Sequence, residues 1–467
     1  MIKFAKIIFV IFISVSSILY TIARPQQPPD KDSQYFAERE HLRSLLKTGE
    51  INSFAFKQFL LSQADFRPSS WPREFWYSIN FADPRGNALL YQDIMIGLAI
   101  GIKRLYRQEE PTFAVDRAVV NILNKRSYLW RGLRATNFYA REYAALAALA
   151  YVVGDTRFTL YKYKLHRSLA ELFAADGTPL EGPAYGLYTI KILAPYVYLT
   201  QDQEARKVID NFKQWLIKSS YNKIVPPLED SPVVKLTSPI SNFAEVNRSF
   251  SDWSFPVIKA GSDSTQDLTI ARKSRYAVWL RHRQNTAPFN LHQQFSSLDV
   301  LLKTPKQWWL ISSGYPGWSS KFDQPYLHNV ATDFKLINND YWWRIFSWIK
   351  KDKPLISNKE NLYVLANSKI TRSIRLFDNG ITVNDAGKSN IRVIWNIKGR
   401  LVDKQTSKNK TVFVWQQGGE KMQLSVIGSR SITIRPGRHA LQKDKIEQHM
   451  VVVIEGKNIT SSFILVD

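Results

Sequence analysis

The chain of 467 residues contains no cysteine and only seven histidines. The lack of cysteine excludes disulfides, which suits a bacterial periplasm better than a eukaryotic secreted domain. Together the two scarcities argue against a structural zinc site. The sequence also has no Lys/Arg-rich run and no motif of a nucleic-acid-binding protein.

Long apolar runs are equally scarce. The one exception is residues 1–23, "MIKFAKIIFVIFISVSSILYTIA", where two lysines precede an apolar stretch. This pattern predicts a signal peptide or a signal anchor, followed by a Pro-rich linker at residues 24–35. We therefore expect an exported protein, periplasmic or extracellular, released or tethered to the inner membrane.

Positive charge is abundant, since 64 lysines and arginines stand against 40 acidic residues, for a net charge of +24. A surface of this sign attracts polyanions such as anionic membrane or acidic polysaccharide. The charge is spread along the chain, as a long anionic groove would require. It is also compatible with a protein that is simply basic, so charge alone does not choose the partner.

The composition, 45% hydrophobic and 13% aromatic, is that of a folded protein. Residues 36–220 carry apolar side chains at three- and four-residue spacing, as in "VDRAVVNILNKR". This spacing predicts helices. The short breaks between them favour antiparallel hairpins, stacked as a solenoid or closed into a toroid.

From residue 251 to 467 the apolar period changes to two, as in "NIRVIWNIKG" and "HMVVVIEGK". These segments predict strands, with turns at "DNG" and at "DAGKSN". Many successive strands without helices between them favour an antiparallel sandwich. Residues 221–250 form the connection, so the predicted class is a multidomain α+β fold.

Three clusters stand out as candidates for chemistry. The first, "LWRGLRATNFYAREY", places arginines around an asparagine, and the second, "DGTPLEGPAYGLY", joins turn signals to a glutamate and two tyrosines. The third runs through "FNLHQQFSSLDVLL", "WWLISSGYPGW" and "YLHNVATDF". Their candidate residues are Arg131, Arg134, Asn137 and Arg141; Glu181, Tyr185 and Tyr188; and His292, Tyr315 and His328.

These residue types suit β-elimination on a uronic acid. An asparagine can hydrogen-bond the C5 carboxylate and favour the charge that develops there. A tyrosine can protonate the leaving O4. To remove the C5 proton it needs nearby positive charge, because its reference pKa is about 10.

The order of these clusters, helical half first and strands second, resembles the heparinase II/III-like polysaccharide lyases, which pair an incomplete (α/α) toroid with a β-sandwich. "DGTPLEGPAYGLY" is similar to the family's DG-S-x-x-E-x-x-x-Y stretch. "LHQQFSSLDVLL" is similar to its H-x-H-x-D-x-x-S-F-x-L motif, and "YLHNVATDF" to its A-H-N-T-V strand. The resemblance covers the chain from about residue 70 to the C-terminus.

The resemblance implies a role for each candidate. Asn137 binds the uronate carboxylate, and Tyr185 is the catalytic acid, with the base role also open to it. His292 matches the first histidine of its motif, and Tyr315 lies where some members place a sandwich tyrosine. The remaining candidates are implied as substrate-binding or supporting residues: Arg131, Arg134, Arg141, Glu181, Tyr188 and His328.

The sequence departs from the family at its metal-binding positions. Gln294, Ser296 and Ser312 stand where the family has a histidine and two aspartates. Only His328 remains of that zinc set, and one imidazole does not hold zinc. We therefore expect no metal and no other cofactor.

Ordinary structural roles compete with each assignment. Asn137 would also serve as a helix N-cap, Tyr185 as packing, His292 as a core histidine, and the three arginines as a solvated face or partners of Glu142. The leading hypothesis is an exported, metal-independent lyase acting on a uronic-acid-containing polysaccharide. A uronate C5 epimerase and a catalytically degenerate polysaccharide-binding protein are the alternatives.

Overall fold

The computed structural model describes most of the chain after the N-terminal segment. The described residues are 31–47, 51–65, 87–109, 111–126, 137–228, 231–282, 298–312, 328–333, 355–359, 361–366, 369–442 and 445–466. The predicted signal or anchor at 1–23 lies outside them. No helix within these ranges is long and apolar enough to cross a membrane.

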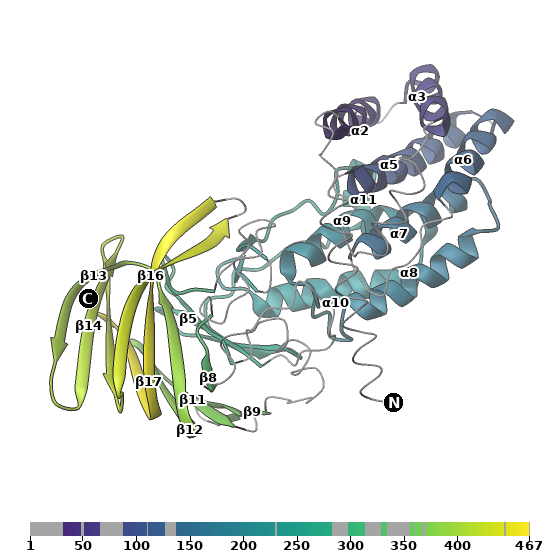
Figure 1. The fold of residues 1–467 in the computed structure, drawn as a ribbon. Coiled ribbons are helices and arrows are strands. Elements are labelled where there is room, and N and C mark those ends of the chain that lie inside the picture. The colour runs from purple at the N-terminus through teal and green to yellow at the C-terminus, as the bar shows by residue number, and fades with distance from the viewer. Residues whose placement is uncertain are drawn as a thin grey trace, which may run out of the picture. The chain divides into compact units, whose positions relative to one another are not determined.

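Helices occupy most of the part of the chain where the apolar spacing predicts them, but the first described helix begins at Lys31, inside the segment expected as a Pro-rich linker (Figure 1). A short helix also forms inside the predicted connection. Their bounds are α2 (Lys31–Lys47), α3 (Ser53–Asp65), α5 (Asn87–Gln108), α6 (Phe113–Arg126), α7 (Asn137–Val152), α8 (Phe158–Leu172), α9 (Pro183–Thr200), α10 (Gln203–Ser219) and α11 (Ala244–Ser249).

Local signals in the sequence set the junction of α7 and α8. Gly154 adopts a φ of +68°, and the next amide, on Asp155, donates to the carbonyl of Ala150. The Asp155 carboxylate then accepts the Arg157 backbone N–H at 2.9 Å, as an N-cap does. Elsewhere among the helices, α5 packs against both α2 and α7.

Strands fill the second part of the chain. Their bounds are β1 (Ile224–Val225), β2 (Val234–Lys235), β3 (Gly261–Ser264), β4 (Leu268–Arg272), β5 (Ala277–Arg281), β6 (Val300–Lys303), β7 (Trp308–Leu310), β8 (Ala331–Asp333), β9 (Leu355–Lys359), β10 (Leu362–Ala366), β11 (Ile370–Phe377), β12 (Gly380–Ile397), β13 (Arg400–Thr406), β14 (Lys410–Gln417), β15 (Glu420–Ile427), β16 (Ser431–Gln442) and β17 (Lys445–Val466).

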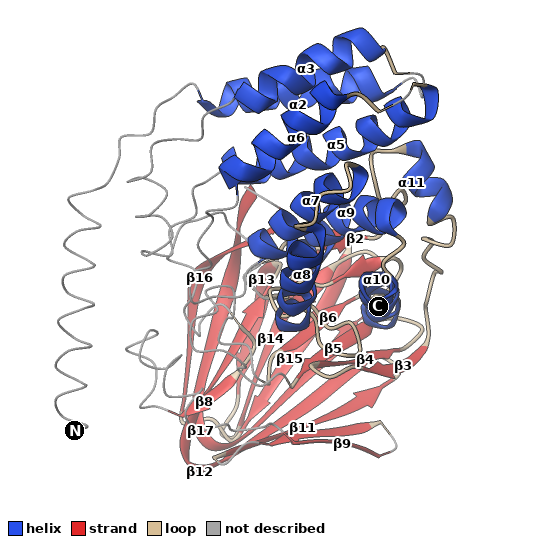
Figure 2. Ribbon diagram, turned by 90° about the vertical axis from the view of Figure 1, so that its right-hand side faces the viewer, coloured by secondary structure: helices blue, strands red, loops and turns tan. Residues whose placement is uncertain are grey.

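In the described residues, β1 and β2 pair with each other, and the other 15 strands form one antiparallel sheet (Figure 2). The long strands β12 and β17 lie side by side and pair along most of their length. Alternate residues of β11 are buried, as a period of two requires. The core of this sheet includes Trp309, Trp395 and Trp415, all fully buried.

One predicted turn is wrong. "DAGKSN" does not separate two strands, because β12 continues through it. The pairing register with β17 shifts there, so that the step from Ala386 to Ile391 lies opposite the shorter step from Asn458 to Gly456. Extra residues in one strand form a bulge and are accommodated without ending the strand.

Contacts divide the chain into two units. The first comprises Met1–Leu169, Thr189–Arg206 and Ile240–Phe250, and the second comprises Ala170–Tyr188, Lys207–Pro239 and Ser251–Asp467. The segment that carries Tyr185 therefore groups with the sheet. The domain boundaries expected at residues 220 and 250 stay predictions.

Two histidines are buried together in the sheet. His439 of β16 and His449 of β17 approach through their Nδ1 atoms at 3.2 Å, so one ring donates and the other accepts. His449 Nε2 lies 2.7 Å from the Asn396 Oδ1, and Lys398 and Glu447 lie beside His439. Burial lowers the pKa of His439 to about 4 and that of His449 to about 3.

This pair predicts acid lability. Both rings stay neutral in the folded protein but bind protons near pH 6.5 once unfolded. The free energy of unfolding should therefore fall as the pH drops from about 6.5 to about 4, by up to about 1.4 kcal/mol per pH unit for each proton. Urea unfolding at a series of pH values measures this slope. The variant His449→Gln should have a shallower slope, and an unchanged slope would contradict the assignment.

Candidate active site

The turn that precedes Tyr185 is tied down at several points. The two oxygens of Asp176 accept backbone N–H groups from Thr178 at 3.0 Å and Gln266 at 2.7 Å. The Thr178 hydroxyl donates to the buried Asp267 at 3.4 Å. Gln266 and Asp267 connect β3 to β4, so this turn is anchored to the sheet.

Glycine is required within the turn. Gly177 has a φ of +89°, and a Cβ there would lie 2.2 Å from the backbone oxygen of Asn211 in α10. The Asn211 side chain donates to the carbonyl of Ala175 at 2.8 Å. A side chain on Gly186 would meet the ring of Phe212 at 2.6 Å. Gly177 and Gly186 thus allow the turn and the first residues of α9 to approach α10 closely.

Tyr185 lies in the first turn of α9, as the turn signals predict. Pro183 begins this helix, where its fixed φ is favourable and its missing N–H costs nothing. The next amide, on Ala184, donates to the Ser231 hydroxyl at 3.1 Å. Tyr185 and Tyr188 are half-buried, and Glu181 is buried. These positions leave the predicted roles of all three untested.

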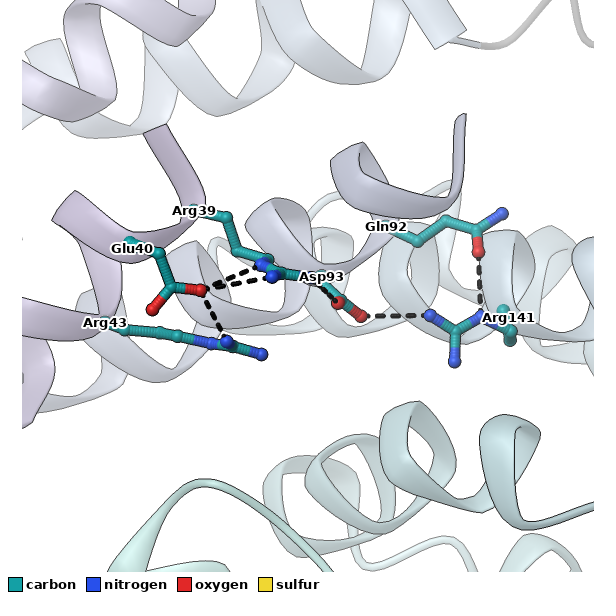
Figure 3. Close-up of polar contacts among 6 residues, drawn as sticks. All are labelled: Arg39, Glu40, Arg43, Gln92, Asp93 and Arg141. Atoms are coloured by element: carbon teal, nitrogen blue, oxygen red, sulfur yellow. Dashed lines mark hydrogen bonds and ion pairs between the residues drawn. The ribbon is translucent and has the colours of Figure 1, made fainter. Parts of the chain in front are cut away.

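Asn137 is the first residue of α7 and is buried. Arg141 follows one turn later, and its guanidinium donates to Gln92 at 3.0 Å and to Asp93 at 2.9 Å (Figure 3). The Arg141 side chain is 0% exposed, so it does not belong to a solvated face. Gln92 and Asp93 belong to α5, and neither was expected as a site residue.

A buried polar cluster surrounds His328. Its Nδ1 lies 2.7 Å from the Ser312 hydroxyl and 3.3 Å from the Asp299 carboxylate. The other Asp299 oxygen accepts the Asn329 backbone N–H at 2.8 Å. The sequence comparison treated Ser296 as a lost aspartate, but Asp299, three residues later, is the carboxylate that reaches His328. The contacts of Asp299 join it to residues about 30 positions away, so no periodicity in the sequence identifies them.

This cluster does not fit a zinc ion. It offers one imidazole and one carboxylate, and a serine hydroxyl is not among the usual ligands of zinc, so it lacks the three or four protein ligands of a zinc site. No group of three His, Cys, Asp or Glu residues in the described ranges could hold a metal ion.

Four predicted site residues lie outside the described residues: Arg131, Arg134, His292 and Tyr315. Gln294 and Ser296 lie outside them as well. Their roles stay predictions.

The order of the helical part and the antiparallel sheet defines a fold class, that of the heparinase-like polysaccharide lyases. The chain is similar to a solved heparinase III, with a TM-score of 0.63 and 14% identity over 94% of this chain and 80% of that one. It is also similar to the heparan sulfate lyase HepC of Pedobacter heparinus, with a TM-score of 0.60 and 16% identity over 95% and 78%. Neither a family model nor a curated protein matches the sequence. At such identities the likeness shows the fold alone.

The contact of Gly177 with α10 predicts that replacing this glycine destabilises the protein more than replacing Gly154, which follows α7. Gly154→Ala should cost about 1–2 kcal/mol, because its φ is positive but nothing lies within 4 Å of the new Cβ. Gly177→Ala should cost more than about 3 kcal/mol, because the Cβ also collides with the backbone of α10. Urea unfolding of the two variants measures the difference. Equal losses would show that the contact with Asn211 is unimportant.

Proposed function

We propose that the protein is an exported, metal-independent polysaccharide lyase that cleaves a uronic-acid-containing polysaccharide by β-elimination. The observation that carries the proposal is the anchored turn that presents Tyr185 at the start of α9. The lyase-like fold supports it, and so does the net charge of +24, which suits an anionic substrate. The toroid and sandwich forms of the two parts belong to the same proposal.

In this reaction Asn137 donates a hydrogen bond to the C5 carboxylate and stabilises the charge that develops there. A base removes the C5 proton, and the electron pair forms the C4–C5 double bond as the C4–O4 bond breaks. Tyr185 gives its phenolic proton to O4. His292 and Tyr315 take part in these proton transfers. Arg131 and Arg134 bind the polymer.

The donor set supports a reaction without a metal. His328 already uses its Nδ1 in the cluster with Ser312 and Asp299, and the sequence has no cysteine. The proposed chemistry needs only an amide, a phenol and an imidazole. The basic chain and the N-terminal segment together fit a periplasmic or extracellular enzyme, released or tethered to the inner membrane.

The departures from the family motifs favour a second candidate, a degenerate polysaccharide-binding protein. Gln294, Ser296 and Ser312 replace the family's metal-site residues, so the scaffold can bind polymer without cleaving it. A C5 epimerase would use the same groups and return the proton to the opposite face. It would exchange the C5 proton with heavy water without cleaving the chain.

Incubation with heparan sulfate, chondroitin, hyaluronan and alginate tests the proposal. Elimination produces a conjugated double bond, so ultraviolet absorbance should rise on at least one polymer. Tyr185→Phe should lose about 10²–10⁴-fold in turnover, because it removes the general acid. Tyr163→Phe, at a tyrosine that is 64% exposed on α8, is the matched control and should keep full activity.

One result would contradict the lyase, and another would contradict only the role of Tyr185. No absorbance on any polymer, with salt-dependent binding, would leave the degenerate binding protein. Full activity in Tyr185→Phe would remove Tyr185 from the mechanism.

A further inference from the structure

We propose that Gln92 and Asp93, through their contacts with Phe138 and Arg141 of α7, are positioning residues for the Asn137 carboxamide. This inference rests on the proposed function, in which Asn137 binds the uronate carboxylate. It replaces the expected substrate contact of Arg141 with an indirect role.

Gln92 is buried and uses both ends of its amide on α7. Its Nε2 donates to the carbonyl of Phe138 at 3.1 Å, and its Oε1 accepts from Arg141 Nε at 3.0 Å. Phe138 directly follows Asn137 in the chain. One side chain of α5 therefore holds the backbone of the first turn of α7 and the side chain one turn later.

Arg141 is the centre of this arrangement. It lies four residues after Asn137 and hence on the same face of α7. Its guanidinium is fully buried and paired with Asp93 at 2.9 Å. Its Nε and Nη2 are already engaged by Gln92 and Asp93, so we assign the guanidinium an indirect role and not a contact with the polymer. Its fork geometry instead fixes the distance between α7 and α5.

The linkage continues to α2. The second oxygen of Asp93 lies 3.5 Å from Arg39, and Glu40 accepts from both Arg39 and Arg43 (Figure 3). Arg43 contacts Glu40 from the same helix, but no contact joins it to Asp93 within the described residues. Arg43 therefore provides a matched control that changes the charge of α2 and leaves the linkage intact.

The expected effect is kinetic. A hydrogen bond that strengthens in the transition state depends on placement, and a displacement of about 1 Å can cost about 100-fold. Gln92→Met keeps the size of the side chain and removes both hydrogen bonds. It should lower kcat about 10–100-fold with little change in KM, because the interaction that it weakens forms fully only in the transition state. Arg43→Gln should leave kcat unchanged.

A double-mutant cycle separates positioning from general stability. In the Asn137→Ala background, Gln92→Met should change kcat/KM by less than about two-fold, because the group that it positions is gone. If the two losses multiply, Gln92 acts independently of Asn137 and the inference fails. Asp93→Asn, which keeps the size and removes the charge, repeats the cycle if Gln92→Met does not fold.

A crystal structure of Gln92→Met gives a test that needs no activity. The Asn137 carboxamide should move by about 1 Å or more, or occupy more than one rotamer. An unmoved carboxamide would overturn the positioning role. An unchanged kcat in Asn137→Ala would instead overturn the role of Asn137, and the absence of elimination by the unsubstituted protein would overturn the proposed function, so these failures are distinguishable.

Discussion

The sheet depends on one buried guanidinium, that of Arg372. It forms a bidentate pair with Asp385 of β12 at 2.6 and 3.0 Å, and it donates to the carbonyls of Leu298 and Asn329. It also lies 4.8 Å from the centre of the Trp395 ring. A buried charge is tolerated only when it is paired and hydrogen-bonded. The guanidinium of Arg372 in β11 therefore requires that β12 and the residues just before β6 and β8 lie close to it. Leu298 and Asn329 flank Asp299 and His328, and the geometry of that cluster follows from this convergence.

The same constraint orders the helices. Arg141 needs Gln92 and Asp93, and the buried Asp202 needs the hydroxyl of Tyr196, at 2.6 Å, and the N–H groups that begin α10. Burial alone would raise the pKa of Asp202, but hydrogen bonds from His166, Tyr196 and the Ala205 N–H together hold it well below its usual range. Buried polar side chains are thus paired across neighbouring helices or at helix ends. The chemistry that we propose uses two such helix starts, Asn137 in α7 and Tyr185 in α9.

Much of the fold could be predicted from the sequence, because helices and strands have different apolar periods. The turn at Asp176 and Gly177 was also evident, since both residue types favour turns. "DAGKSN" misled because turn residues also form bulges, and only a paired strand decides between the two. Gln92, Asp93 and Asp299 were missed because each matters through a partner far away in the sequence. The roles predicted for His292 and Tyr315 stay predictions.

The central claim is that the protein breaks a glycosidic bond by elimination and not by hydrolysis. The mass of the products tests it most directly, because elimination adds no water to the newly formed non-reducing end. Digestion of heparan sulfate and the other uronate polymers, followed by mass spectrometry, should give oligosaccharides lighter by one water than hydrolysis products. Products with the full mass of the hydrolysed chain would contradict the account, as would an intact polymer in every digest.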